Sequence, residues 1–271
     1  MVLSTYNWSS VLRHSVRSVL WQTYRNLELL VIGDGCTDDS EQVVASFGDE
    51  RVRWHNLDTN SGSQATPNNV GLETARGEYI AYQGHDDVWH PRHLATMIAH
   101  LQAADAEIGH SLAEVLGPPG TKVRFLTGLF DDEGMPRRWW IPPTSVVHRT
   151  ELGRRIGGWR TWEEGVAPDE DFVDRAREPG TPLISVPALT AFKFPSSFRP
   201  NAYRERPSHE QGAYIRRIER ERLFVEREFA ALAWRRLSPD KGQLDTEPPT
   251  DADKVDAKST FAYLRRVRGL D

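Results

Sequence analysis

The first hundred residues alternate between short apolar runs and amphipathic segments, and this pattern constrains the fold more than any other feature. We expect strands at Met1–Thr5, Leu27–Ile32, Arg51–His55 and Glu78–Tyr82, and the segments between them place apolar residues at helical spacing. A continuous apolar run such as Leu27–Ile32 is typical of a parallel strand covered on both faces. Four repeats of strand and helix with short links predict a doubly wound α/β sheet.

A cluster of polar residues follows three of these runs. The clusters are Ser4-Thr5-Tyr6, Asp34-Gly35 and His85-Asp86-Asp87. Ligands of open α/β sheets bind at the carboxyl ends of the strands. The sequence therefore predicts that the three clusters meet in one crevice.

The pattern is less regular after Leu101. We expect strands at Ala106–Leu116 and Lys122–Phe130, a return to the sheet at Arg138–Val147, and helices at Thr150–Ile156, Asp169–Arg177 and Ser208 to about Leu237. We expect a catalytic domain (1–200), which consists of a nucleotide-binding half (1–103) and an acceptor-binding half (104–200). A helical region (201–237) and a linker with a short tail helix (238–271) are expected to follow it. Because Asp245–Asp256 is rich in prolines and acids, the chain after about Ser238 is predicted to be dispensable for the chemistry.

Composition limits the compartment and the partners. The chain of 271 residues has a net charge of −5 and a pI near 6.0, which argues against a nucleic-acid partner. Cys36 is the only cysteine, so no intrachain disulfide forms. No stretch approaches the roughly 20 apolar residues that cross a bilayer, and Met1 leads into an apolar run without the basic region of a signal peptide. The sequence predicts a cytoplasmic protein without a transmembrane segment.

Further motifs extend the strand-end clusters in a fixed order. They are Val2–Asn7, Ser18–Tyr24, Glu28–Asp39, Asn60-Ser61-Gly62, Asn69-Val70-Gly71, Ala75–Ile80, Asp86–Trp89, His148-Arg149, Ile156–Trp159 and Asp169–Arg175. This ordered set, over roughly residues 1–195, resembles the family 2 glycosyltransferases of the GT-A fold. The resemblance implies a mixed, Rossmann-like sheet flanked by helices, with a C-terminal helical extension. It also implies that several residues precede Met1 in the first strand.

The resemblance further implies an inverting enzyme that moves a sugar from a nucleotide-diphosphate donor to an acceptor hydroxyl. A UDP-sugar or dTDP-sugar is favoured, because Asp34 would accept a hydrogen bond from the N3–H of uracil or thymine. Tyr6 would stack on the base with Ser4 at its edge, and Asn69 would belong to the nucleotide site. The acceptor class stays open between a glycan, a lipid-linked molecule and a small molecule. A turn or helix cap is the alternative role for Asp34, and plain packing is the alternative for Tyr6.

A divalent ion held by carboxylates can neutralise the leaving diphosphate. The resemblance assigns Mn²⁺ or Mg²⁺ to Asp87, and the ribose or the water shell of the ion to Asp86; a helix-capping acid pair is the alternative. The family usually has another acid two residues before Asp86, where this chain has Gly84. It often has an arginine near the phosphates where this chain has Asn68.

The acceptor hydroxyl needs a positioned base, because its pKa lies far above 7. The resemblance places that base on an aspartate ahead of an arginine, and the spacing to Arg175 selects Asp169. Glu170 and Asp171 are the neighbouring alternatives, and an acidic helix start is the structural one.

Other candidate contacts are less specific. Trp139 and Trp140 would line the acceptor pocket or the edge of a strand. His148 and His209 would approach the diphosphate or serve only the structure, and Arg199 and Arg204 would contact phosphates. The arginines interleaved with acids in the last long helix indicate a solvated face, with peripheral membrane contact as the alternative.

Two rival functions remain open. A nucleotidyltransferase usually needs a Gly-rich basic loop after the first strand, and Ser4–Asn7 has none. A non-catalytic nucleotide- or sugar-binding relative is favoured by Gly84 and Asn68.

Overall fold

The computed structural model describes residues 1–121, 123–129, 141–161, 167–177, 180–205, 210–237, 263 and 265–270. The strands are β1 Val2–Thr5, β2 Leu29–Gly33, β3 Val52–Asn56, β4 Tyr79–Gly84, β5 Val88–Trp89, β6 Ile108–Leu116, β7 Arg124–Thr127, β8 Val146–Arg149 and β9 Leu183–Lys193. The helices are α1 Ser9–Leu20, α2 Ser40–Ala45, α3 Ala65–Thr74, α4 His93–Ala103, α5 Thr150–Arg155, α6 Pro168–Ala176, α7 Ala202–Glu205, α8 Glu210–Arg220 and α9 Phe224–Leu237. Short 3-10 turns lie at Pro143–Ser145 and Ser196–Phe198.

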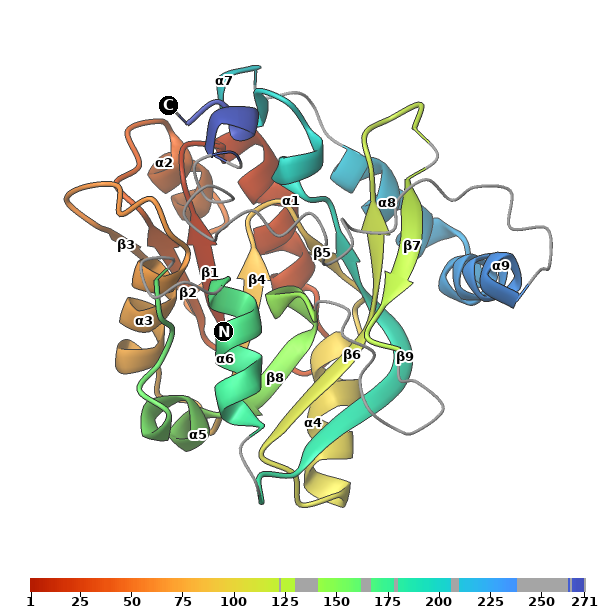
Figure 1. The fold of residues 1–271 in the computed structure, drawn as a ribbon. Helices are drawn as coiled ribbons and strands as arrows, with labels where there is room; N and C mark the ends of the chain where they lie inside the picture. The colour runs from red at the N-terminus through yellow and green to blue at the C-terminus, as the bar shows by residue number, and fades with distance from the viewer. Residues whose placement is uncertain are drawn as a thin grey trace.

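One mixed sheet runs through the described part of the chain in the order β3-β2-β1-β4-β8-β6-β9-β5, with β7 added beside β6 (Figure 1). The strands β1 to β4 are parallel, as the alternating pattern predicts, whereas β8 is antiparallel to both β4 and β6. The pairing of β4 with β8 joins the two expected halves of the catalytic domain directly. The α/β class with a mixed sheet flanked by helices is confirmed.

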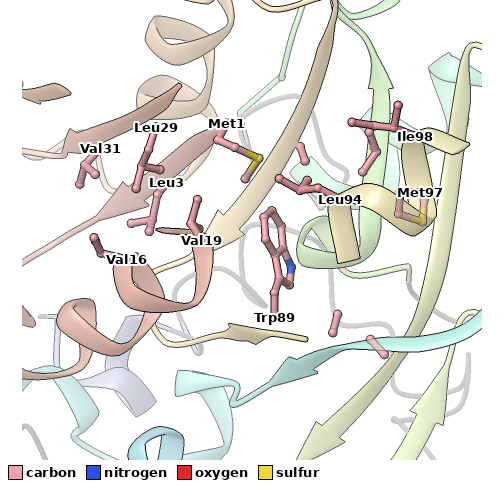
Figure 2. Close-up of a cluster of buried hydrophobic side chains, with 14 of the residues drawn as sticks. Met1, Leu3, Val16, Val19, Leu29, Val31, Trp89, Leu94, Met97 and Ile98 are labelled. Carbon is pink, nitrogen blue, oxygen red and sulfur yellow. The ribbon is translucent and has the colours of Figure 1, made fainter. Parts of the chain in front are cut away.

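Both faces of the sheet are covered, which explains the continuous apolar runs. Leu3 points to the face covered by α1, α2 and α4, where Val19, Trp89 and Met97 close the core (Figure 2). Val2, its neighbour along β1, points to the opposite face and packs in a second cluster with residues of α3 and α6. Successive side chains of a strand point to opposite faces, so every side chain of a strand that is buried on both faces lies in an apolar environment.

The second half of the chain departs from the sequence expectation at three places. The first is β9, which the sequence pattern does not predict, yet it runs parallel to β6 over most of its length and antiparallel to β5 at its end. It ends at Lys193, which contacts Asp87 in the loop that follows β4.

The second departure is the single long helix expected from Ser208 to Leu237, which is wrong because the chain turns between α8 and α9. The turn is closed by a hydrogen bond from the Phe224 backbone N–H to the Glu221 carbonyl (2.9 Å). It brings the ring of Phe224, which is 1% exposed, against Tyr214 with ring centroids 5.6 Å apart. A continuous charged helix would leave this ring and Leu232 out of the cluster that they complete on β6 and β9.

The third departure is the strand expected at Arg138–Val147, which is displaced along the chain. Pro143–Ser145 form a 3-10 turn, β8 begins only at Val146 and continues to Arg149, and residues 138–140 lie outside the described ones. The other boundaries differ only at their ends. Among the residues that the structure describes, no helix combines the length and apolarity needed to cross a bilayer.

Candidate functional site

The three polar clusters meet at one edge of the sheet, as predicted. The strand ends are level, since Thr5 pairs with Gly33 and Ser4 pairs with Gly84. The Asp34 backbone N–H donates to the Thr5 carbonyl (2.8 Å), which continues the strand pairing past the end of β2. Residues that follow β1, β2 and β4 therefore share one crevice edge.

Asp34 is buried and held from the loop that follows β3. Its carboxylate accepts hydrogen bonds from the Asn60 side-chain amide (2.9 Å) and the Ser61 backbone N–H (3.0 Å). Burial raises the pKa of Asp34, and the donors of the loop act against that rise. Gly35 has a φ of +70°, and a Cβ there would lie 2.4 Å from the Asn60 backbone nitrogen. Only glycine lets the two loops approach closely enough for this contact.

The acid pair gathers around the backbone of Gly84. A Cβ at Gly84 would lie 2.9 Å from Oδ1 of Asp86 and 2.9 Å from Oδ2 of Asp87, so both carboxylates face the same point. Their side chains are buried, Asp87 completely. The space for the acid that the family usually has at this position is therefore already taken by the other two.

Lys193, at the end of β9, is a site residue that the sequence analysis missed. Its Nζ lies 3.2 Å from Oδ2 of Asp87, while the Phe194 backbone N–H donates to Oδ1 (3.1 Å). Burial would lower the pKa of Lys193, but Asp87, Asp86 and Asp169 outweigh it and the pKa is raised. Burial raises the pKa of Asp87 to about 6, with Asp86 adding to the rise and Lys193 opposing it.

One signal in the sequence could have pointed to Lys193. The chain has 29 arginines but only five lysines, at 122, 193, 241, 254 and 258. Among the described residues, Lys193 is the only lysine. A compact ammonium on a flexible stem fits beside a buried carboxylate where a planar guanidinium needs more room.

A group of buried and partly buried rings lies beside the acid pair. Tyr203 of α7 packs on Trp8 and Tyr6, with ring centroids 5.4 Å and 6.0 Å apart. Its hydroxyl lies 3.2 Å from Nε2 of His85, and Nδ1 of His85 accepts from the Tyr6 backbone N–H (3.2 Å). Burial lowers the pKa of His85 to about 4, so the ring is neutral and Nε2 carries the proton that it donates to Tyr203.

Asp169, from the second half of the chain, acts on Lys193 through its charge. Asp169 lies in the first turn of α6, and its charge contributes to the raised pKa of Lys193. Its neighbour Asp171 is paired with Arg175, whose guanidinium also donates to the Ile156 carbonyl. Asp171 therefore has a structural partner within its own helix.

The donor set fits a divalent ion that arrives with a diphosphate better than one bound by the protein alone. Both oxygens of Asp87 already accept from Lys193 and Phe194, and no described residue donates a hydrogen bond to the Asp86 carboxylate. The described part of the chain holds no group of three or more His, Cys, Asp or Glu side chains suited to a metal. Mg²⁺ is commonly held by one or two carboxylates together with substrate phosphates.

Two predicted site residues make other contacts. The Asn69 side chain exchanges two hydrogen bonds with the Trp159 backbone, at 2.9 Å and 2.7 Å. His148 is fully buried, with Nε2 3.3 Å from the Tyr82 hydroxyl, and burial lowers its pKa to about 4. His148 pairs with Ile80, four residues before the end of β4, so it lies in the body of the sheet and not at its carboxyl edge.

Arg199 and Arg204 make hydrogen bonds to other parts of the chain. Arg199 is 7% exposed, and its guanidinium donates to the Leu116 and Gly117 carbonyls and to Glu210 (2.7 Å). These partners account for Arg199 without a phosphate. Arg204 donates to the Gly269 carbonyl (3.2 Å). Trp139, Trp140 and His209 lie outside the described residues.

Residues 1–137 match the family described as Glycosyl transferase family 2. The chain is 34% identical over 110 residues to the glycosyltransferase GlyG of Streptococcus pneumoniae, which covers 40% of this chain and 36% of GlyG. An uncharacterized glycosyltransferase of Nostoc sp. is 28% identical over 182 residues, 61% of this chain and 56% of that protein. The chain spans about a third of the length of the first curated relatives, 32% for the glycosyltransferase of Rickettsia typhi.

Solved structures with low sequence identity share the fold. S. aureus TarS 1-349 in complex with UDP-GlcNAc superposes with a TM-score of 0.59 at 18% identity, covering 98% of this chain and 80% of that one. The mannosyltransferase PcManGT of Pyrobaculum calidifontis, in complex with GDP-Man and Mn²⁺, gives a TM-score of 0.55 at 16% identity, with 98% and 84% covered. The mixed sheet of this chain is thus similar to that of GT-A glycosyltransferases.

Proposed function

The chain belongs to glycosyl transferase family 2, because the family match covers just over half of the residues of the chain, and from this premise we propose a reaction. The protein transfers a sugar from a nucleotide-diphosphate donor to an acceptor hydroxyl. UDP-sugars, or the similar dTDP-sugars, are the donors that the Asp34 pocket suits best. The acceptor is an alcohol of a glycan, a lipid-linked molecule or a small molecule.

The observation that carries this proposal is that a buried carboxylate and an ammonium both lie among the residues at the carboxyl ends of the central strands. Asp34 offers a buried carboxylate, held by Asn60, Ser61 and Gly62, which suits the N3–H of a pyrimidine base. Lys193 offers an ammonium at the same edge of the sheet, which suits a diphosphate. Asp34 follows β2 and Lys193 ends β9, and Lys193 joins the site through its contact with Asp87 after β4.

The positive charge that Asn68 cannot supply comes, in this proposal, from Lys193. Asn68 is 2% exposed, so its position faces the interior. Gly84 has a similar explanation, since Asp86 and Asp87 fill the space that a third acid would need. Neither departure from the family pattern therefore requires a non-catalytic protein.

Asp169 is proposed as the general base. It takes the proton of the acceptor hydroxyl while the acceptor oxygen bonds to the anomeric carbon and the bond from that carbon to the diphosphate oxygen breaks. The electron pair of the broken bond leaves on the nucleoside diphosphate, where Lys193 is placed to meet the added charge. Attack opposite the leaving group inverts the anomeric configuration.

A divalent ion, Mn²⁺ or Mg²⁺, would add charge neutralisation at the leaving diphosphate. Asp86 would hold it, shared with the phosphate oxygens, because Asp87 is engaged with Lys193. This exchanges the roles that the resemblance gave to Asp86 and Asp87.

The proposal is tested by nucleotide binding to an Asp34→Asn variant. Calorimetry should show UDP binding to the unaltered protein and about 10- to 100-fold weaker binding to the variant, since hydrogen bonds to charged groups contribute about 1.5–3 kcal/mol. The advantage of UDP over CDP should shrink as well, because cytosine has no N3–H to donate.

Asp39→Asn is the matched control. Asp39 is an exposed aspartate of the same loop, and its side chain makes no helix-capping hydrogen bond. Equal losses in the two variants would point to the charge of the loop instead of the pocket. If UDP, dTDP, CDP and GDP all fail to bind the unaltered protein, with and without Mn²⁺, the proposed function is wrong.

A further inference from the structure

The end of the chain returns to the donor edge of the sheet. In the C-terminal segment (residues 265–270), the Val267 carbonyl accepts from the Asn201 backbone N–H (2.7 Å), and the Gly269 carbonyl accepts from Arg204 Nε (3.2 Å). Figure 1 shows this segment, in dark blue, beside α7. Two hydrogen bonds thus fix the segment along the helix that carries Tyr203.

The segment also reaches the loop that holds Asp34. A Cβ at Gly62 would lie 2.8 Å from Nη1 of Arg265, so the guanidinium lies directly over that glycine. Gly62 follows Ser61, whose backbone N–H donates to Asp34. The segment therefore bridges α7 and the base pocket.

Arg268 lies between the two residues that are fixed in this way, Val267 and Gly269. Burial raises the pKa of Tyr203 to about 12, and the charge of Arg268 opposes that rise while Asp86 and Asp34 add to it. The same Arg268 charge contributes, after burial, to the lowered pKa of His85. The charge of Arg268 therefore acts on the rings that border the acid pair.

The Nε of Arg268 is buried and has no hydrogen-bond partner among the described residues. A buried N–H donor without an acceptor is costly, because it has lost its hydrogen bonds to water without replacing them. An anion placed beside Tyr203 and His85 would supply the missing acceptor. The oxygens of a diphosphate suit a guanidinium, which can bind them through two parallel hydrogen bonds.

We propose that the C-terminal segment completes the donor site and that Arg268 binds the diphosphate of the donor. This inference rests on the proposed function. It reverses the sequence prediction that the chain after Ser238 is dispensable for the chemistry. Lys193 and Arg268 then approach the phosphates from two different parts of the chain, one from the sheet and one from the C-terminal segment.

The test compares Arg268→Met with Arg266→Met in the full chain, because Arg266 is an exposed arginine of the same segment. Calorimetry would measure the dissociation constants of UDP and of uridine, which has the base but no phosphates. The Arg268→Met variant should bind UDP about 10-fold more weakly, equivalent to about 1.4 kcal/mol. Uridine binding should not change, and Arg268→Lys should recover part of the loss. Arg266→Met should bind UDP within about twofold of the unaltered protein.

Each other result overturns the inference in a recognisable way. Equal UDP affinities of the two methionine variants would show that Arg268 does not meet the phosphates. Tighter UDP binding by Arg268→Met would show that the segment competes with the donor. A loss of uridine binding as large as that of UDP would assign Arg268 a role in shaping the base pocket alone. If the unaltered protein binds neither ligand, the proposed function fails before Arg268 is in question.

Discussion

Replacing Lys193 with methionine should destabilise the protein by an amount that depends on pH. Methionine keeps much of the aliphatic stem and removes the ammonium that lies 3.2 Å from the fully buried carboxylate of Asp87. Leaving a buried charge without its partner usually costs about 3–5 kcal/mol. That figure assumes that the remaining group stays charged.

Asp87 can avoid the cost of an unpaired buried charge, because it can take a proton. Its pKa is already about 6 in the folded protein. At pH 7 the ionised form is favoured over the protonated form by one pH unit, or about 1.4 kcal/mol. Without Lys193, Asp87 takes a proton if keeping its charge would cost more than about 1.4 kcal/mol, which is what protonation costs at pH 7. Protonation therefore sets the limit, and we expect a loss of about 1–2 kcal/mol at pH 7.

The sign of the pH dependence follows from the direction of the shift. The pKa of Asp87 rises from an ordinary 3.8 to about 6 on folding, so the folded protein binds more protons between these values. The stabilisation from this group is complete below about pH 4 and is lost as the pH rises through 6. At pH 5 Asp87 is mostly protonated even beside Lys193, so the substitution should then cost less than about 0.5 kcal/mol.

Urea denaturation at pH 5 and pH 7 measures both values. The control is the same substitution in an Asp87→Asn background, where the pH-dependent part of the loss should disappear, since no carboxyl remains to titrate. An equal loss at the two pH values, or a loss of about 3–5 kcal/mol at pH 7, would refute the reasoning from the protonation of Asp87.

Two further predictions concern α6. Asp169→Asn should lower the transfer rate at saturating donor by about 10²–10⁴-fold while the UDP affinity changes little, because general-base catalysis contributes on that scale; an active Asp169→Asn beside an inactive Glu170→Gln would move the base by one residue. Phe172→Ala should lower the free energy of unfolding by about 3–5 kcal/mol, because Phe172 is 1% exposed and stacks on Trp159 with centroids 4.5 Å apart. A loss below about 1 kcal/mol in urea denaturation would show that this cluster repacks without the ring.

The sequence by itself determined the first half of the fold and the edge at which the site forms. The short apolar runs indicate strands that are covered on both faces, and the polar clusters that follow them lie at the carboxyl ends of parallel strands. Both signals are local, so the amino-acid sequence alone is enough to place Asp34, Asp86 and Asp87 at the same edge. The resemblance of the ordered motifs adds roles that the pattern alone does not contain.

Only the tertiary structure decided which groups from the rest of the chain meet that edge. Lys193 reaches Asp87 across 106 positions because β9 runs beside β6 and ends against β5. Tyr203 and Arg268 arrive from α7 and the C-terminal segment, and neither carries a local sequence signal for the donor site. The turn before α9 likewise follows from the burial of Phe224 and not from its own helical pattern. Long-range partners are chosen by packing and charge after the sheet has formed, and the spacing of residues along the chain does not encode them.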